Sequence, residues 1–377
     1  MKVEQLVWDD GWNHVAGEKV GTDANLVLLF AQRELLEDPK YYDDLRERYP
    51  SAHIVSVSTS GEISLSEVNV GTLTTTVIKF EATPVEAAEV VFADYPNSYE
   101  AGKALAAKIP HENLRHVCIF SDGQHVNGSE LIKGVNAVVG REVSASGGLA
   151  GDGAQFTRTL VGLNQAPDEG KIVILGFYGD KIKVGYGSKG GWEPFGPVRK
   201  ITKAEGNVLY ELDGKPALDL YKSYLGEKAS ELPASALLFP ILINVNGVSL
   251  VRTVLNVNPE ANSIIFAGDM PVGATAQLMK TNYNDLVEAA GQAAEEAKTL
   301  LGGDEPQFAL LISCVGRRLV LNQRVDEEVE EVRNIFGENT VMAGFYSYGE
   351  LAPATAMAPC ELHNQTMTIT AFSERVN

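Results

Sequence analysis

The hydrophobic positions of the chain form a strand–helix–strand pattern that occurs three times. Apolar stretches typical of buried strands open the copies at Leu26–Phe30, Val117–Phe120 and Ala309–Cys314. Each copy continues with an amphipathic segment and a second apolar strand, and ends at a small tetrapeptide built on glycine: Ser60–Ile63, Ser146–Leu149 and Tyr348–Leu351. Internal repetition indicates related structural units. Glycine after a buried strand lets the backbone approach a ligand closely, so the three turns are predicted to converge on one site.

The spacing of apolar residues between these strands predicts amphipathic helices, several with clear ends. Pro39 in a first turn starts one helix, and Gly302 with Gly303 ends another. The predicted helices are Asp38–Tyr49, Ser98–Ile109, Ser129–Val139, Asp285–Leu301 and Val325–Phe336. A long helix thus precedes a strand–helix–strand copy in each half of the chain. We expect an α/β fold with mixed sheets, in which two related lobes enclose a ligand cleft.

Glycine and proline also mark a boundary between the lobes. The 377 residues are too many for one ordinary core. Gly179 and Asp180 are typical of a hairpin turn, and the strands beside it are predicted at Lys171–Tyr178 and Lys181–Gly187. The glycine- and proline-rich stretch that follows is predicted to link two domains. We therefore expect a lead of residues 1–24, an N-terminal lobe of residues 25–190 and a C-terminal lobe of residues 191–377.

Composition excludes several classes of partner. With 31 Lys and Arg against 50 Asp and Glu, the net charge is −19. Such a surface repels phosphate backbones and anionic lipids, so neither nucleic acid nor a membrane is an expected partner. The longest apolar run, Ala234–Val245, is too short to span a bilayer, and Met1–Asn13 does not resemble a signal peptide. The three widely spaced cysteines favour a reducing compartment, so we predict a cytoplasmic protein.

An ordered set of segments is similar to one known family. Ser58–Ile63, Asp122–Gly123 and Ser146–Asp152 resemble the N-terminal FIST module of intracellular signal transduction proteins. A second set resembles the C-terminal FIST module: Trp192–Pro197, Glu211–Ala217, Cys314–Arg317, Gly344–Glu350 and Leu362–Thr368. The resemblance covers the chain from about residue 25 to residue 372.

The resemblance implies a sensory module that binds a small ligand, such as an amino acid or a similar metabolite. Members of the family occur beside histidine kinases and cyclic-dinucleotide enzymes, so a protein of one of these kinds is the expected partner. The chain resembles the stand-alone type because it leaves no room for a fused output domain. Some stand-alone bacterial members are haem-binding nitric oxide sensors. A haem sensor is therefore the alternative hypothesis, and the cofactor is otherwise unknown.

Glu62 and Glu350 directly follow glycine at matching positions of two repeats. Their carboxylates would face a shared pocket and bind a ligand amine or a water; alternatively, each accepts hydrogen bonds from the backbone of its own turn. The second repeat has Gly148 at this position, and Asp152 could replace the missing carboxylate. The recurring turn is the reason for predicting a ligand site at Ser60, Gly61, Glu62, Gly147, Gly148, Asp152, Tyr348, Gly349 and Glu350.

Cys314 and Arg317 complete the predicted ligand site, at the end of a buried strand. A thiolate beside Arg317 would be a nucleophile, which makes a cysteine-dependent enzyme the third hypothesis. In the alternative, Cys314 is a buried core thiol, and the planar guanidinium group of Arg317 binds an acidic residue or a ligand carboxylate. We favour ligand binding and predict no catalytic residues.

Histidines and one glycine-rich motif are the residues that could bind a metal, a haem or a dinucleotide. The six histidines have neither HxxxH nor HExxH spacing, so no metal site is predicted. One axial histidine is enough for haem, and His363 in the family-like tail is the first candidate; alternatively, it is a strand-edge residue bonded to backbone. Gly185–Gly190 satisfies GxGxxG, but the sequence after it cannot form the helix that a dinucleotide site requires.

Overall fold

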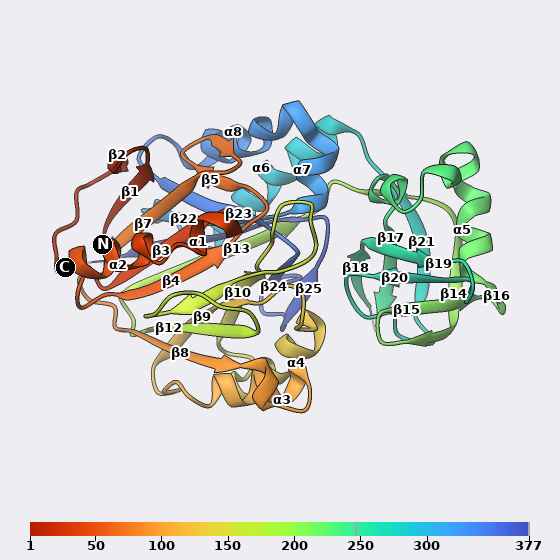
Figure 1. The fold of residues 1–377 in the computed structure, drawn as a ribbon, viewed down its shortest axis with the longest axis horizontal. Coiled ribbons are helices and arrows are strands. Elements are labelled where there is room, and N and C mark those ends of the chain that lie inside the picture. Colours follow the sequence, from red (N-terminus) through yellow and green to blue (C-terminus); the bar gives the residue numbers. More distant parts are fainter. Residues whose placement is uncertain (246, 376–377) are drawn as a thin grey trace.

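The computed structural model describes residues 1–245 and 247–375 and has a large and a small lobe (Figure 1). The large lobe contains three six-stranded sheets with their helices, and residues 193–280 form the small lobe around an eight-stranded sheet. The first residue and the last strand meet in the large lobe, where the Met1 ammonium group is 3.0 Å from the Glu374 carboxylate. The predicted mixed α/β fold with two lobes is confirmed, but the prediction that the lobes are related is wrong, because the sheet of the small lobe is antiparallel and holds none of the repeated units.

Each sheet of the large lobe is built around one parallel strand pair. The first sheet has the order β11 (Val161–Leu163), β4 (His53–Ser58), β3 (Leu26–Ala31), β7 (Leu73–Lys79), β1 (Lys2–Trp8) and β2 (Trp12–Gly17). The second has the order β25 (Cys360–His363), β24 (Gly349–Pro353), β10 (Ser144–Leu149), β9 (Leu114–Ser121), β12 (Lys171–Tyr178) and β8 (Val85–Val91). The third has the order β13 (Ile182–Lys189), β26 (Met367–Glu374), β22 (Phe308–Cys314), β23 (Val341–Ser347), β5 (Glu62–Ser64) and β6 (Glu67–Asn69).

The three sheets repeat one arrangement of strands, which confirms the predicted strand–helix–strand repetition. The parallel pairs are β3 with β4, β9 with β10, and β22 with β23. In each sheet an antiparallel strand, β7, β12 or β26, lies on the other side of the first parallel strand. The repeats all belong to the large lobe, and the small lobe is an insertion between β13 and the remainder of the third unit.

After each parallel pair, the chain leaves its own sheet and joins a neighbouring one. Strands β5 and β6 of the first unit extend the third sheet, and β11 of the second unit extends the first sheet. Strands β24 and β25 of the third unit extend the second sheet. The exchange is cyclic, so no sheet is complete without a neighbouring unit.

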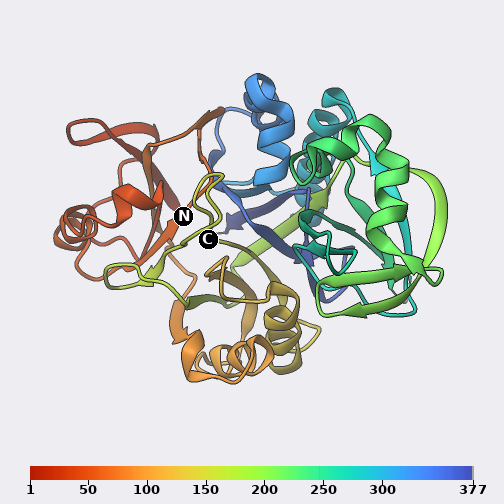
Figure 2. The ribbon, with the colours of Figure 1, turned by 45° about the vertical axis from the view of Figure 1, so that its right-hand side comes forward.

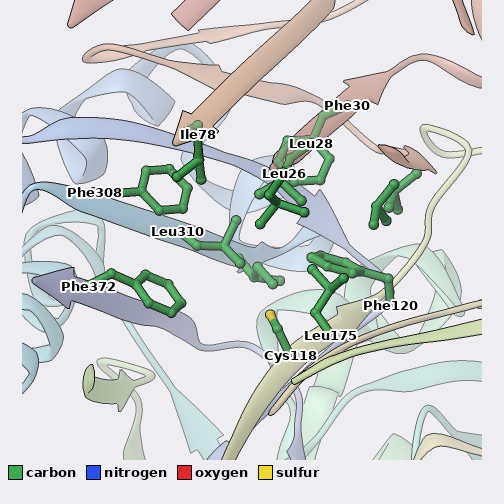
Figure 3. Close-up of a cluster of buried hydrophobic side chains, with 14 of the residues drawn as sticks. Leu26, Leu28, Phe30, Ile78, Cys118, Phe120, Leu175, Phe308, Leu310 and Phe372 are labelled. Carbon is green, nitrogen blue, oxygen red and sulfur yellow. The ribbon is translucent and has the colours of Figure 1, made fainter. Parts of the chain in front are cut away.

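Strands of the large lobe are buried on both faces. Along β3, Leu26, Leu28 and Phe30 point into a core shared by the three sheets, whereas the alternate residues pack outward. Figure 3 shows that Phe120 and Phe308 of the other sheets meet the β3 side chains in this core. Strands covered on both sides lack an alternating polar pattern, which explains the continuous apolar runs in the sequence.

Helices cover the outer faces of the sheets, around the shared centre seen in Figure 2. The first sheet carries α2 (Lys40–Arg48), the second α3 (Ser98–Ala106) and α4 (Gly128–Val139), and the third α6 (Tyr283–Leu300) and α8 (Val325–Phe336). The shorter helical segments are α1 (Arg33–Leu36), η1 (Phe92–Asp94), α7 (Val315–Leu321) and η4 (Asn322–Arg324). The five predicted helices are thus present, with ends shifted by a few residues or none.

The small lobe has its own apolar core, and the segments that enter and leave it are hydrogen-bonded to each other. Its elements are β14 (Glu193–Glu205), β15 (Val208–Leu212), β16 (Lys215–Pro216), α5 (Ala217–Leu225), η2 (Gly226–Glu231), η3 (Ala234–Leu238), β17 (Ile241–Val245), β18 (Val248–Arg252), β19 (Val254–Asn258), β20 (Ser263–Phe266) and β21 (Thr275–Lys280). Where the chain enters and leaves the lobe, the Thr281 hydroxyl group donates to the Gly191 carbonyl oxygen at 2.6 Å.

Several local expectations differ from the structure. Residues 1–24 contain β1 and β2, which pair into the first sheet. The Gly147–Gly148 pair lies within β10 instead of in a turn, so the second glycine turn was wrongly predicted. The GxGxxG segment lies mostly in strand β13 and does not lead into a helix. This agrees with the prediction that it is not a dinucleotide site. The division of the chain at residues 190 and 191 stays a prediction, because the third unit has strands on both sides of it.

Candidate functional site

A cleft of about 700 Å³ lies where the two lobes meet. The large lobe lines it with residues 123–128, Leu149, Phe156, residues 314–316, Tyr348 and Asn364. The small lobe lines it with Asn207, Pro233, Leu237, residues 253–256 and residues 266–268. Its volume falls in the range of about 300–1,000 Å³ that is typical of small-molecule sites. The cleft is therefore the candidate ligand site.

One wall of the cleft is the loop between β9 and α4, which Asp122 holds in place. A buried Asp122 oxygen accepts hydrogen bonds from the backbone N–H groups of Gln124 and His125 at 2.8 and 2.7 Å. The same oxygen lies 3.2 Å from Nδ1 of His125, which leaves Nε2 as the ring nitrogen that could contact a ligand. Asn127 caps α4 by accepting from the Glu130 N–H group at 3.1 Å. The wall is thus rigidly built.

A second wall is aromatic, and Asp152 fixes it from behind. The rings of Phe156 and Tyr348 stack with centroids 4.5 Å apart and planes inclined by 15°. Asp152 accepts hydrogen bonds from the Tyr348 hydroxyl group and from the Phe156 and Arg158 N–H groups. Burial opposes ionisation of Asp152, but these hydrogen bonds outweigh it and lower the pKa of the carboxyl group. Asp152 therefore shapes the cleft without lining it.

Two buried polar atoms on cleft residues lack an internal partner. Within residues 1–245 and 247–375, neither Oδ1 of Asn364 nor Oγ1 of Thr253 has a hydrogen-bond partner. The two residues come from different lobes but lie near the same contact, in which Nη1 of Arg252 donates to the Leu362 carbonyl oxygen at 2.9 Å. Buried polar groups are usually hydrogen-bonded, and because these two atoms belong to residues that line the cleft, a molecule bound there is the candidate for their missing partner.

The predicted site residues are only partly brought together. Cys314 and Tyr348 line the cleft. The other predicted residues are buried elsewhere or behind the lining: Ser60, Gly61, Glu62, Gly147, Gly148, Asp152, Arg317, Gly349 and Glu350. The following contacts account for the positions of the most informative of them.

Glu62 and Glu350 occupy matching positions, and each accepts hydrogen bonds from hydroxyl groups and from the backbone N–H group of a threonine further along the chain. The Glu62 carboxylate accepts from the Thr59 hydroxyl group and from N–H and Oγ1 of Thr72. The Glu350 carboxylate accepts equivalent bonds from Ser347 and Thr366. Burial raises the pKa of both, to about 8 for Glu350, against the opposing effect of these hydrogen bonds. Glu62 thus joins β5 to the residue just before β7, and Glu350 joins β24 to the residue just before β26.

Arg317 is fully buried and uses its donors within the protein. Nε and Nη2 donate to one Glu328 oxygen at 2.9 and 2.6 Å. Nη1 donates to the Gly190 carbonyl oxygen at 2.6 Å, and Nη2 also reaches the Leu286 carbonyl oxygen at 2.8 Å. The guanidinium group thus ties α6, α7 and α8 together and is not placed to bind a ligand carboxylate.

Gly147 is needed for close packing inside the second sheet. Its φ is +145°, and a Cβ there would lie 1.9 Å from the Ile119 carbonyl oxygen. Gly148 faces Ile312, whose Cγ2 would be 2.7 Å from an added Cβ. These glycines therefore serve the contact between strands and core rather than the approach of a ligand.

Cys314 lines the cleft, but its surroundings disfavour a thiolate. Burial, and then the Glu350 carboxylate, raise the pKa of the thiol well above its usual value. The backbone N–H groups and Arg317 oppose this shift only in part. A nucleophilic role for Cys314 has no support in this geometry.

His363 does not fit the role of an axial haem ligand. Its ring is buried, and Nε2 lies 3.0 Å from the Ala352 carbonyl oxygen within the second sheet. Burial lowers the pKa of the ring to about 4, so it is held neutral and satisfied by backbone. His363 is absent from the lining of the cleft, whereas its neighbour Asn364 belongs to it.

Sequence reasoning missed Asn364, Thr253, Phe156 and most of the small-lobe lining. Residues 122–123 and 362–368 already belonged to motifs similar to the FIST modules, and that was the available signal for the loop and for Asn364. Thr253 sits in an ordinary apolar strand sequence, so nothing in its neighbourhood marks it.

Comparison with known families identifies the chain. The FIST N domain matches residues 25–215, and the FIST C domain matches residues 217–353. The protein therefore belongs to the FIST family, which is associated with signal transduction and small-ligand binding. In the part of the chain that the structure describes, no helix is long and apolar enough to cross a membrane.

Individual relatives match only in part. An uncharacterized protein of Methanocaldococcus jannaschii is 28% identical over 221 residues, which are 53% of this chain and 41% of that protein. An uncharacterized protein of Mycobacterium tuberculosis is 26% identical over 191 residues, which are 48% of this chain and 49% of that protein. The matches thus span less than half the length of either relative.

Solved structures resemble the chain only distantly. The crystal structure of cyanuric acid hydrolase from A. caulinodans has a TM-score of 0.38 and 8% identity, and covers 95% of this chain and 92% of that one. A chorismatase structure has a TM-score of 0.38 and 9% identity, with 98% of each chain covered. At these scores the likeness carries no functional conclusion.

Proposed function

We propose that this protein is a cytoplasmic sensor that binds a small metabolite in the cleft between its lobes and signals through a separate partner. The observation that carries the proposal is the interlobe cleft with unpartnered buried atoms on Asn364 and Thr253. Membership of a family associated with signalling and ligand binding agrees with it. The cysteines, all buried free thiols, are in keeping with a reducing compartment.

A ligand in this cleft would touch both lobes, and this suggests how binding is transmitted. The direct polar contacts beside the cleft include Nη1 of Arg252 with the Leu362 carbonyl oxygen, and Nδ2 of Asn127 with Asp269 at 3.0 Å. Because a ligand shifts an equilibrium only by its differential affinity for the two states, one that bridges the lobes stabilises their closed arrangement. A partner protein would respond to this change at the lobe surfaces.

The ligand site can be tested with a cleft-filling variant. Leu255 is 44% exposed and lines the cleft, so Leu255→Trp should narrow it without disturbing the core. Val272 lies in the same lobe, is 61% exposed and is outside the lining, so Val272→Trp is the matched control. In a thermal-shift screen of a metabolite library, at least one compound should raise the Tm of the wild type and the control, and raise it less in Leu255→Trp. Equal shifts in all three proteins would contradict a site in the cleft.

The partner is proposed from the family, with a histidine kinase or a cyclic-dinucleotide enzyme as the expected kind. Each candidate enzyme from the same organism would be assayed with the protein, with and without the compound found above. We expect the compound to change enzyme activity only when the protein is present, and not with Leu255→Trp. Activity that never depends on the protein would refute signalling through such enzymes.

A further inference from the structure

The cleft presents polar groups without formal charge. Of the described residues that line it, none is Lys, Arg, Asp or Glu. Five of them instead carry side-chain amides: Gln124, Asn127, Asn207, Asn256 and Asn364. His125, Cys314 and Tyr348 are the titratable residues of the lining, and burial together with the hydrogen bond to Asp152 raises the pKa of the Tyr348 hydroxyl group, which is therefore neutral.

The charged residues behind the lining already have hydrogen-bond partners within the protein. Asp152 accepts hydrogen bonds from Tyr348 and the adjoining backbone. Asp269 binds Asn127 and lies 3.3 Å from the ammonium group of Lys133. Arg252 is buried and donates to the carbonyl oxygens of Asp269 and Leu362. Because none of these charged residues lines the cleft, a zwitterionic ligand would leave water without a Lys, Arg, Asp or Glu side chain in direct contact as its countercharge, which is costly.

The chemistry of the two unpartnered atoms, Oδ1 of Asn364 and Oγ1 of Thr253, indicates which hydrogen bonds a ligand should make. Nδ2 of Asn364 donates to the His363 carbonyl oxygen at 3.0 Å, so the atom left over is Oδ1, an acceptor. It requires an N–H or O–H group from the ligand. Oγ1 of Thr253 can donate to a carbonyl oxygen or accept a hydrogen bond. A ligand that carries both an N–H donor and a carbonyl acceptor, as a secondary amide does, would satisfy both atoms.

The remaining lining is apolar and suits a body larger than one amino acid. Val126, Leu149, Val254 and Phe266 contribute aliphatic and aromatic surface, next to the stacked Phe156 and Tyr348 rings. A volume of about 700 Å³ corresponds to roughly 20 water molecules at ~30 Å³ each. A single free amino acid would leave much of this space unfilled.

We propose, resting on the function proposed above, that the ligand is an uncharged molecule with secondary amide groups and apolar side groups, of which cyclic dipeptides are the simplest representatives. The amide N–H group donates to Oδ1 of Asn364, and the Thr253 hydroxyl group donates to the amide carbonyl oxygen. The side groups pack on the apolar walls. Free amino acids and linear peptides are excluded by their paired charges.

Cyclic and linear dipeptides of the same composition carry the same side groups, but only the linear ones carry terminal charges, so comparing them tests the effect of charge on binding. Isothermal titration calorimetry would compare cyclo(leucyl-phenylalanine) and a panel of related cyclic dipeptides with the linear dipeptides of the same composition. At least one cyclic compound should bind at least tenfold more tightly than its linear counterpart. Tighter binding of linear peptides or free amino acids would overturn the proposed ligand class while leaving the sensor function intact. Absence of binding across the cyclic panel would also overturn the ligand class, and the metabolite screen would still judge the function.

A threonine pair supplies the structural control. Thr253→Val removes an unpartnered hydroxyl group, so the protein should be as stable as the wild type or more so, while the cyclic ligand binds about 5–10-fold more weakly. Thr74→Val removes a similarly buried, unpartnered hydroxyl group in β7, on a residue that does not line the cleft, and should leave affinity unchanged. Equal affinities of the wild type and Thr253→Val for the cyclic ligand would refute the assigned contact.

Discussion

Glu62 and Glu350 show how a buried carboxyl group can be accommodated without a paired cation. Each accepts hydrogen bonds from two hydroxyl groups and one backbone N–H group. Such bonds satisfy the oxygens but do not fully compensate for burial, so the pKa of each stays raised. The consequence is a dependence of stability on pH that belongs to the fold rather than to ligand binding.

Glu350→Gln should remove part of this pH dependence. The pKa of Glu350 rises from 4.5 to about 8 on folding, so its contribution to stability is fully present below pH 4.5 and is lost as the pH rises through about 8. Gln has no proton to lose. The unfolding free energy of the wild type, relative to Glu350→Gln, should fall by roughly 2–4 kcal/mol between about pH 5 and about pH 8. Urea denaturation across this range measures it.

An exposed carboxyl group supplies the control for this experiment. Glu47 on α2 is exposed, so Glu47→Gln should keep the pH profile of the wild type. Because Arg317 and the Cys314 thiol also interact with Glu350, the comparison is made between variants and not with an absolute curve. Parallel profiles for the wild type and Glu350→Gln would show that Glu350 is ionised throughout.

The three thiols should react slowly in the native protein. Burial raises the pKa of Cys118 to about 12, and it also raises the pKa values of Cys314 and Cys360 well above their usual value. Since the thiolate is the reactive form, iodoacetamide near neutral pH should modify all three at similar low rates, and much faster after unfolding in urea. Mass spectrometry after timed quenching measures the rates. Selective rapid labelling of Cys314 would favour the cysteine-dependent enzyme after all.

At the scale of elements, glycine sets how closely helices approach sheets. Helix α6 crosses β13 so closely that a Cβ at Gly185 or Gly187 would lie 1.9 or 2.1 Å from carbonyl oxygens of the helix. Helices α3 and α4 meet in the same way, through Gly102 and Gly134. The GxGxxG segment thus owes at least two of its glycines to helix packing, which is why the motif occurs here without a dinucleotide site.

Gly185→Ala should separate α6 from the third sheet. The added methyl group would clash with the Ala297 carbonyl oxygen, which belongs to backbone and cannot move alone. We expect a loss of about 1–3 kcal/mol in unfolding free energy by urea denaturation. Gly21→Ala is the control, because its nearest neighbour is the Asp23 carboxylate at 3.1 Å, and it should change stability little. Equal stability of the two variants would contradict the close packing.

At the scale of the whole molecule, cyclic strand exchange makes the large lobe one cooperative body. Each sheet takes strands from two units, and side chains of all three sheets meet in one core. The small lobe, by contrast, has a separate core and leaves the third unit between neighbouring residues Gly191 and Thr281. We therefore expect the large lobe to fold without the small lobe.

Excision of the small lobe tests this division. Replacing residues 193–280 with a short glycine–serine linker joins positions that already lie together, and Trp192 stays anchored by its Nε1 bond to the Gln365 carbonyl oxygen at 3.0 Å. We expect a folded large lobe with cooperative thermal unfolding by circular dichroism. It should bind none of the compounds that bind the full chain, because half of the cleft is gone. Non-cooperative unfolding of the excised protein would show that the large lobe depends on the insertion.

The sequence by itself determined the strands, the helices and their repetition, because these follow from local periodicity, caps and buried apolar runs. It also placed Glu62 and Glu350 at equivalent positions, and their matching hydrogen bonds agree with this. Helix Val325–Phe336 has the predicted ends because its apolar stripe and terminal glycine are local features.

Only the tertiary structure decided where the site lies. The recurring Gly-Glu turns indicated carboxylates in a cleft, but neighbouring Thr and Ser residues satisfy those carboxylates inside the fold. The cleft is instead lined by both Asn364 and Thr253, which are 111 residues apart along the chain, beside the contact between Arg252 and Leu362. No local sequence pattern predicts that these residues line one cleft, because this depends on how an inserted lobe packs against strands that cross between sheets.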